Sequence, residues 1–219
     1  MNENIKIIYE DNYIIAVHKP AGLATQTSRL GEKDLFSEIK NYLNGGYVGI
    51  INRLDQPVEG IVLMAKDSES ASVLTKQIKE GSTDKYYRAK VYLNSLVDIT
   101  IGKTISLTDY MKKDSSSNLS VICEASDEAA KDARLEYSVV DITNNIAALD
   151  IHLLTGRHHQ IRLQLSNAGM PILGDTKYGS TESKIYSRNN RIKNVQLCAY
   201  KYAFTHPKTH ERVELTLPN

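Results

Sequence analysis

The amino-acid sequence predicts a single α+β domain over residues 1–219. Short runs rich in β-branched and aromatic residues, bounded by turn signals, recur along most of the chain. Segments with apolar residues at helical spacing lie between some of these runs, and neither an internal repeat nor a linker divides the chain. The chain has 219 residues, of which 41% are hydrophobic and 24% charged, so it can bury a sizeable core.

The first part of the chain predicts strands and two capped helices. The expected strands cover 5–9, 13–17, 47–51 and 61–65. Asp34 can cap a helix that ends at Gly45 and Gly46. Asp67 or Ser68 can cap a second helix that ends at Gly81.

The rest of the chain predicts further strands and one more helix. The expected strands cover 85–93, 134–141, 146–153, 196–204 and 212–217. Thr155 can cap a helix that ends at Gly169, before Pro171. Segment 96–130 gives no clear pattern, although its serines at 115–117 suit a hairpin or a loop, and 180–194 is expected to be a loop.

A charged motif precedes the apolar run 61–65. Arg53 and Asp55 flank one leucine, and Pro57 and Gly60 then turn the chain into the run. Residues two apart in an extended chain share a face, so the two charged side chains can point into the same space. On this pattern alone Asp55 is either a structural ion-pair partner of Arg53 or a catalytic carboxylate.

Several functional classes are disfavoured. No apolar run approaches the roughly 18 residues of a membrane span, and residues 1–4 lack a signal-peptide pattern, so we expect a cytoplasmic protein with no membrane partner. Cys123 and Cys198 lack CxxC spacing and are expected to be buried free thiols. There is no GxSxG, Walker or GxGxxG motif.

Charge is distributed unevenly along the chain. The net charge is only +1, which argues weakly against a nucleic-acid partner when taken globally. Between Lys177 and Arg212, however, eight Lys or Arg residues accompany two acids, Glu182 and Glu211. This excess forms either a phosphate-binding surface or a merely solvated face.

The stretch 155–162 carries adjacent histidines between arginines. His158 and His159 cannot share one helix face, so this is not the i, i+4 zinc arrangement, and no metal is expected. Arginine and histidine at the start of a helix suit recognition of phosphate or carboxylate, because the free N–H groups of the helix terminus add to their charge.

Taken together, six blocks resemble the RluA-type pseudouridine synthases, in the family's order and over nearly the whole catalytic domain. The blocks are residues 14–22 (IIAVHKPAG), 52–60 (NRLDQPVEG), 85–91 (KYYRAKV), 155–162 (TGRHHQIR), 170–179 (MPILGDTKYG) and 197–207 (LCAYKYAFTHP). The resemblance implies a central mixed, mostly antiparallel sheet with flanking helices and an RNA-binding cleft. No N-terminal RNA-binding accessory domain is expected.

The resemblance also implies a reaction: cofactor-free isomerisation of uridine to pseudouridine in ribosomal or transfer RNA. Asp55 falls on the family's aspartate, which is the proposed nucleophile or the glycal-forming base. A nearby arginine favours the ionised carboxylate that this role needs. Arg162 matches the basic partner of that aspartate, and Tyr87 matches a tyrosine that stacks on uracil and assists removal of the C5 proton.

Further residues are expected to contact RNA. Arg53 matches the arginine associated with opening the RNA and occupying the space of the flipped base. The basic stretches add further contacts, at Arg157, His158, His159 and Lys177. His159 is expected to act as a structural hydrogen-bonding residue rather than as a proton shuttle. We expect the protein to be a monomer.

The sequence departs from the family pattern around the aspartate. Asn52 stands in place of the usual histidine, and Val58 and Glu59 replace Thr-Ser. These changes put in question the hydrogen bonding around Asp55, and Glu59 would repel phosphate unless it points to solvent. His158 occupies a position often held by a small hydroxyl residue, so it is either an RNA contact or a neutral substitution.

Two other functions remain open on the sequence. The first is a catalytically weak protein that binds RNA or assists its folding on the same scaffold. The second is a hydrolase of N-glycosides, because both reactions begin near C1′. Release of free uracil would distinguish the hydrolase, and loss of isomerisation in an Asp55→Asn variant would distinguish the synthase from a non-catalytic binder.

Overall fold

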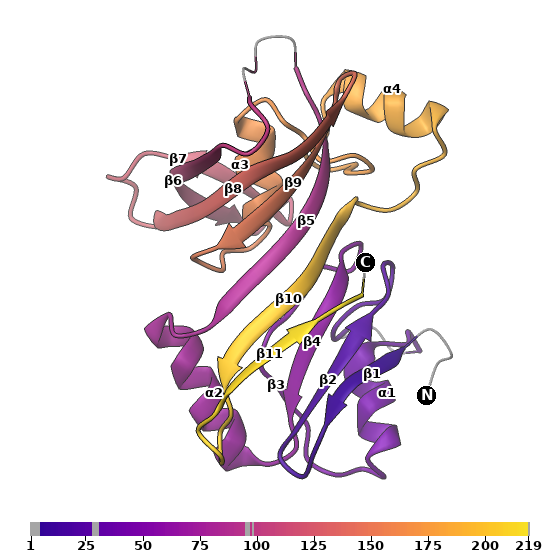
Figure 1. The fold of residues 1–219 in the computed structure, drawn as a ribbon, viewed down its shortest axis with the longest axis vertical. Coiled ribbons are helices and arrows are strands. Elements are labelled where there is room, and N and C mark those ends of the chain that lie inside the picture. The colour runs from indigo at the N-terminus through magenta and orange to yellow at the C-terminus, as the bar shows by residue number, and fades with distance from the viewer. Residues whose placement is uncertain (1–4, 28–30, 95–96, 98, 219) are drawn as a thin grey trace. The chain divides into compact units, whose positions relative to one another are not determined.

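The computed structural model describes residues 5–27, 31–94, 97 and 99–218 (Figure 1). The chain divides into two compact units, unit 1 with residues 1–85 and 198–219, and unit 2 with residues 86–197. Residues 1–4, for which no signal peptide was expected, and Leu96 and Asp98, in the segment without a clear pattern, lie outside the described residues. The single domain over 1–219 stays a prediction.

Unit 1 combines a mixed sheet with two helices, α1 (Leu35–Tyr42) and α2 (Ser68–Glu80). Its strands are β1 (Lys6–Glu10), β2 (Ile14–Lys19), β3 (Gly49–Ile50), β4 (Glu59–Ala65), β10 (Leu197–Thr205) and β11 (Arg212–Thr216). Their order is β1-β2-β4-β10, with β3 beside β4 and β11 beside β10. Among the strands that the structure describes in unit 1, β4 and β10 pair in parallel and the other pairs are antiparallel.

Local capping explains where the helices of unit 1 begin and end. The carboxylates of Asp34 and Asp67 accept hydrogen bonds from the backbone N–H of Ser37 and Ser70, which is the expected N-cap arrangement. Gly81 ends α2 in the left-handed conformation, with φ 71°. These three predictions are confirmed.

Gly60 lets β4 and β10 approach each other closely. Its φ is 134°, and a Cβ added to it would lie 2.5 Å from the backbone N and O of Ala199 on β10. A side chain at this position would therefore both strain the backbone and separate the two strands. The strand that follows the Asp55 motif is fixed in place by this contact.

We expect the substitution Gly60→Ala to lower the free energy of unfolding by about 2–3 kcal/mol, because strain and overpacking add. Chemical denaturation of the purified protein measures this. Gly81→Ala is a matched control, because Gly81 also has a positive φ but has open space around it. It should lose only about 1 kcal/mol. Equal losses in the two variants would show that the contact with Ala199 is unimportant.

Unit 2 is an antiparallel sheet with two helices, α3 (Gln160–Asn167) and α4 (Thr181–Asn189). Its strands are β5 (Asp84–Tyr92, which begins with the last two residues of the first segment of unit 1), β6 (Thr104–Asp114), β7 (Leu119–Cys123), β8 (Lys131–Thr143) and β9 (Ile146–Leu153). They lie in the order β5-β9-β8-β6-β7, and Figure 1 shows β6 and β7 as a hairpin beside α3. Buried residues alternate with exposed ones along most of β5 and with half-buried ones along β9, so one face of the sheet forms the core.

Two helix predictions in unit 2 are wrong. Thr155 does not cap α3; its hydroxyl donates to Gln160 Oε1 (2.8 Å) and accepts from the backbone N–H of Arg134 (2.8 Å), which extends the pairing of the β8–β9 hairpin. The N-cap residue is His159, with φ 54°. The expected loop 180–194 contains α4, capped by Ser180, whose hydroxyl accepts a hydrogen bond from the N–H of Ser183.

The remaining expectations for the fold are mostly confirmed. The α+β class and the mixed, mostly antiparallel sheet with flanking helices are observed, and segment 96–130 supplies the β6–β7 hairpin with the serines of 115–117 at its turn. Cys123 and Cys198 form no disulfide but are half-buried rather than buried. In the described part of the chain, no helix has the length and apolar character needed to cross a membrane.

Candidate active site

The Asp55 motif forms a turn between β3 and β4 in unit 1. The backbone N–H of Val58 donates to the carbonyl oxygen of Asp55 (3.0 Å), which closes the turn. Leu54 is buried, Asp55 is half-buried and Arg53 is exposed. The carboxylate is thus carried by a tight turn whose neighbouring leucine is anchored in the core.

A second loop, residues 20–25, holds this turn from the side. Thr25 Oγ1 donates to the carbonyl of Leu54 (2.9 Å) and accepts from the N–H of Leu54 (3.2 Å). Gly22 and Gln56 are joined by two hydrogen bonds, one from the N–H of Gly22 to the carbonyl of Gln56 (2.8 Å) and one from Gln56 Nε2 to the carbonyl of Gly22 (3.1 Å). The residues on both sides of Asp55 are therefore fixed.

Lys19 ties the two loops together from inside the protein. Its side chain is fully buried, and Nζ donates to the carbonyls of Pro20 (3.1 Å), Leu23 (2.7 Å) and Gln56 (3.2 Å). Burial lowers the pKa of Lys19 to about 8, although the negative charges of Asp55 and Glu59 oppose that shift. A cation is thus retained below pH 8 because three carbonyl oxygens and nearby carboxylates compensate for its burial.

The buried lysine predicts a pH dependence of stability. Because the pKa of Lys19 is lower in the folded state, the unfolded state binds more protons between about pH 8 and 10.5, so the contribution of Lys19 to stability rises with pH there. Between pH 7.5 and 9.5 we expect wild type to gain about 2 kcal/mol relative to Lys19→Met. Urea unfolding at each pH measures this, with the exposed Lys40→Met as control. Parallel curves for wild type and Lys19→Met would contradict it.

The departures from the family pattern have defined structural roles. Asn52 makes two hydrogen bonds to β4, from its Nδ2 to the carbonyl of Ile61 (3.0 Å) and from the N–H of Leu63 to its Oδ1 (2.7 Å). Val58 is buried in the core. Glu59 is half-buried rather than fully solvated, and its negative charge acts on His18 and Lys19, raising the pKa of both against the lowering effect of burial.

In unit 2, Arg162 on α3 is buried and paired with Asp175. Arg162 Nε donates to Asp175 Oδ2 (2.7 Å) and its Nη2 donates to Oδ1 (2.8 Å), which is a bidentate pair. Burial opposes ionisation of Asp175, but the hydrogen bonds and charge of Arg162, together with the N–H groups of Tyr178 and Lys177, lower its pKa. Asp175 is therefore ionised at neutral pH and fixes the guanidinium of Arg162.

A network of aromatic rings and hydroxyls surrounds the start of α3. His159 is buried, with Nδ1 2.9 Å from the Tyr178 hydroxyl, which fits its expected structural role. His158 stacks on His159 at 3.7 Å between ring centroids, and its Nδ1 lies 2.9 Å from the hydroxyl of Ser120 on β7. The N–H of Ser120 donates to the Tyr178 hydroxyl (2.7 Å). His158 thus helps to attach the β6–β7 hairpin to the start of α3.

Tyr86 and Tyr87 face opposite sides of the unit 2 sheet. Tyr87 is buried, with 8% of its surface exposed, and lies opposite Ile151 on β9. Tyr86 is half-buried and its ring stacks on His152, with centroids 4.5 Å apart. Successive residues of a strand point to opposite faces of the sheet, which explains the different environments of the two rings.

The predicted site residues fall in both units. Unit 1 carries Asp55 and Arg53, and unit 2 carries the other six, Tyr87, Arg157, His158, His159, Arg162 and Lys177. Within unit 2, the guanidinium carbon of Arg162 lies 5.4 Å from the ring centre of Tyr178, which contacts His159. Exposed Arg157 donates to the carbonyl of Asp132 (2.8 Å) and exposed Lys177 to that of Asn118 (2.9 Å).

Sequence reasoning missed two supporting residues. The position of Lys19 could have indicated its role, because this charged residue closely follows the apolar run 14–17. Asp175 accepts hydrogen bonds from the N–H groups of Lys177 and Tyr178 within its own loop, and it also pairs with Arg162. The pairing with Arg162 has no local signal, because the two residues lie thirteen positions apart along the chain.

Two solved structures have folds similar to that of this chain. Human RNA Pseudouridylate Synthase Domain Containing 1 matches with a TM-score of 0.77 and 20% identity, over 99% of this chain and 84% of that chain. Human RNA Pseudouridylate Synthase Domain Containing 4 matches with a TM-score of 0.74 and 19% identity, over 97% and 87%. At these identities the likeness shows the fold, which is that of pseudouridine synthases.

The sequence comparison then shows the family. The family model for RNA pseudouridylate synthase matches residues 13–167, so the chain belongs to that family. "Ribosomal large subunit pseudouridine synthase C" of Rickettsia bellii is 35% identical over 83% of this chain, which spans only 59% of that relative. "Dual-specificity RNA pseudouridine synthase RluA" of Vibrio cholerae is 28% identical over 98% of the chain and 82% of the relative. "tRNA pseudouridine synthase C" of Pasteurella multocida is 30% identical, covering 96% and 90%. The expected RluA-type resemblance is confirmed.

Proposed function

We propose that the protein is an RNA pseudouridine synthase that isomerises specific uridines in structured ribosomal or transfer RNA. The observation that carries the proposal is the placement of Asp55. Its carboxylate stands on a turn fixed by Thr25, Asn52 and buried Lys19, in a chain of the RNA pseudouridylate synthase family. A half-buried carboxylate on a rigid support is suited to act on a sugar carbon.

The proposed reaction is an isomerisation, so it requires no cofactor to balance it. The bond between N1 of uracil and C1′ of ribose breaks, the base turns, and a bond forms between C5 and C1′. The proton of C5 leaves, and N1 gains a proton. Asp55 acts on the ribose either by attacking C1′ or as the base that forms a glycal. The carboxylate is regenerated at the end of either route.

The other site residues have proposed roles in unit 2. Tyr87 stacks on the uracil and assists removal of the C5 proton. Arg162 is the basic partner of the catalytic carboxylate, and its bidentate pair with Asp175 supports this role because it fixes the guanidinium.

RNA binding is proposed for the remaining predicted residues. Arg53 and Arg157 are exposed cations, and Arg53 fills the position of the base after it is flipped out of the RNA. His158 and His159 lie directly before α3. Lys177 lies in the loop of Asp175, to whose carboxylate its backbone N–H donates. We also propose that the protein acts as a monomer in the cytoplasm, through an RNA-binding cleft in one catalytic domain over 1–219.

Site-by-site mapping of pseudouridine tests this function. Ribosomal and transfer RNA from cells with and without the protein would be compared at every uridine. We expect one or a few positions to lose pseudouridine when the protein is absent and to regain it when the gene is restored. Identical maps in both RNA classes would overturn the proposal and favour a non-catalytic RNA-binding protein.

A further inference from the structure

The basic excess between residues 177 and 212 separates into two groups in the structure. In one group each cation has a partner. Lys201 pairs with Glu214 at 2.9 Å, Lys208 pairs with Glu69 at 2.7 Å, and Arg212 pairs with Asp84. Lys177 donates to a backbone carbonyl. Carboxylates thus neutralise the charges of Lys201, Lys208 and Arg212 within the protein, whereas Lys177, already proposed as an RNA contact, keeps its charge.

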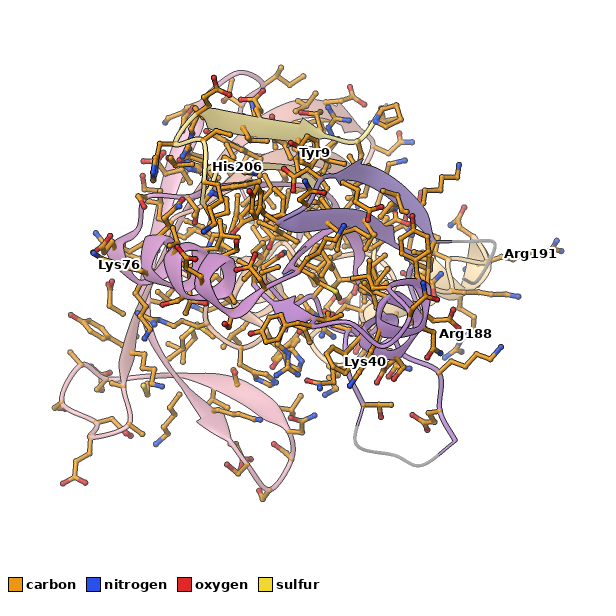
Figure 2. All side chains as sticks on the ribbon, turned by 90° about the horizontal axis from the view of Figure 1, so that it is seen from below. Tyr9, Lys40, Lys76, Arg188, Arg191 and His206 are labelled. Atoms are coloured by element: carbon orange, nitrogen blue, oxygen red, sulfur yellow. The ribbon has the colours of Figure 1, made fainter. Side chains whose placement is uncertain are left out.

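The other group is concentrated on α4 and the turn that follows it. It consists of Lys184, Arg188, Arg191 and Lys193, all of them exposed. Among the residues that the structure describes, none of these four side chains forms an ion pair or a hydrogen bond. The single acid between 180 and 194 is Glu182. We call these four residues the α4 cationic patch. Figure 2 shows the labelled Arg188 and Arg191 pointing away from the ribbon.

The arrangement of the patch is unfavourable for stability alone. Lys184 and Arg188 are four residues apart on α4, where like charges repel. Arg191 adopts φ 56°, a conformation that usually falls to glycine or asparagine. The helix dipole explains the cations at the C-terminal end of α4 but disfavours Lys184 near its start. A ligand with several negative charges would remove the repulsion.

The patch has a rigid support. Ser183 and Ser187 form the buried side of α4, and Ser187 Oγ accepts the N–H of Gly174 at 2.9 Å. A Cβ on Gly174 would lie 2.1 Å from the carbonyl oxygen of Asn194, so the end of the turn also packs on this loop. The same loop carries Asp175, the partner of Arg162. The backbone that carries the four cations is therefore held in place within unit 2.

We propose that the α4 cationic patch binds phosphate groups of the substrate RNA. This inference rests on the proposed function and specifies which surface grips the RNA. Exposed lysine and arginine heads without internal partners suit a polyanionic backbone, because binding releases its condensed counterions. The patch contributes affinity and orientation, whereas the sequence of the RNA is read elsewhere.

The test compares RNA binding of two variants with equal loss of charge. The patch variant is K184Q/R188Q/R191Q/K193Q, and the control is K6Q/K40Q/K76Q/K79Q, in which four exposed lysines of unit 1 are replaced. The probes are unmodified transcripts of tRNA and of large-subunit ribosomal RNA. The dissociation constant is measured from 0.05 to 0.4 M KCl, together with kcat and KM for pseudouridine formation.

We expect the patch variant to bind RNA at least about ten-fold more weakly at 0.1 M KCl. The slope of log affinity against log KCl concentration should be smaller in magnitude by about 1.4 or more, which is equivalent to two phosphate contacts. KM should rise while kcat at saturating RNA stays unchanged, and the control should change affinity less than about three-fold. Binding by the patch variant equal to wild type, or equal weakening in the control, would overturn the inference.

A variant that retains the positive charges distinguishes weaker binding caused by loss of charge from weaker binding caused by disturbed folding. R188K/R191K keeps the positive charges, so it should bind both probes like wild type; binding as weak as that of K184Q/R188Q/R191Q/K193Q would contradict phosphate contact by charge. Wild type that binds RNA without forming pseudouridine would refute the proposed function but not binding by the patch. Wild type that forms pseudouridine while the patch variant binds normally would refute only the patch.

Discussion

Asp55→Asn is expected to abolish pseudouridine formation, lowering kcat by at least about 10⁴-fold, while RNA binding is retained. The amide is close in size to the carboxylate, so the turn between β3 and β4 should keep its shape, but it supplies neither a nucleophile nor a base. The backbone carbonyl and N–H groups on either side of Asp55 make the hydrogen bonds to Thr25 and Gly22, and these remain in the variant. Single-turnover assays with the enzyme in excess over the RNA measure the loss of the rate of pseudouridine formation.

Glu59→Gln is a matched control for this substitution, because it removes a carboxylate four residues away on β4 without touching the proposed nucleophile. It should keep kcat within about ten-fold of wild type. A loss in Glu59→Gln as large as in Asp55→Asn would indicate that overall negative charge, rather than one reacting carboxylate, supports activity. Near-normal activity of Asp55→Asn would refute the assignment of Asp55.

Asp175→Asn is expected to lower the free energy of unfolding by about 3–5 kcal/mol, because it removes the charged partner of a buried arginine. Arg162 and Asp175 have side chains only 3% and 0% exposed, so water cannot readily replace the lost carboxylate. The low pKa of Asp175 makes this contribution complete at neutral pH. This stabilisation is lost as the pH falls from the ordinary pKa of an aspartate to the lower pKa of Asp175 in the folded state. The difference in unfolding free energy between wild type and Asp175→Asn should therefore become smaller in acid.

Denaturant unfolding at pH 7 and at pH 3 measures both effects. Asp127→Asn is the control, because Asp127 pairs with Lys112 on the surface, where solvent screens the pair, and its loss should change stability far less. A double variant, Arg162→Met with Asp175→Leu, should be more stable than Asp175→Asn because no buried charge remains. Equal stability of wild type and Asp175→Asn at pH 7 would contradict the account of this pair.

Local signals made much of unit 1 predictable. Asp34, Asp67 and Gly81 act through hydrogen bonds or backbone angles within a few residues, so the sequence alone indicates where both helices begin or end. The Asp55 turn was likewise recognised from Pro57, Gly60 and the apolar strand that follows. Its support by Lys19 could not be predicted, because the carbonyl of Gln56 that Lys19 Nζ contacts lies 37 residues further along the chain.

Tertiary contacts explain the errors in unit 2. Thr155 has the side chain of a good cap, but its hydrogen bonds to Arg134 keep it in the β8–β9 hairpin, and α3 begins later. Helix α4 is short and polar, and its buried side consists of serines that pack against Gly174 and Gly179. A serine face gives no apolar periodicity, so the segment resembled a loop. For the site, the family blocks supplied the residues and their roles, whereas local pattern alone left Asp55 undecided.

The most direct test of the central claim follows the hydrogen at C5 of uracil. RNA transcripts labelled with tritium at C5 of uridine would be incubated with wild-type protein and with Asp55→Asn. Isomerisation must release the C5 hydrogen, because C5 becomes the carbon attached to ribose. We therefore expect wild type to release tritium into water with no free uracil, and Asp55→Asn to release none. Retention of all tritium by the RNA, or its appearance in free uracil, would contradict the claim that this protein is a pseudouridine synthase.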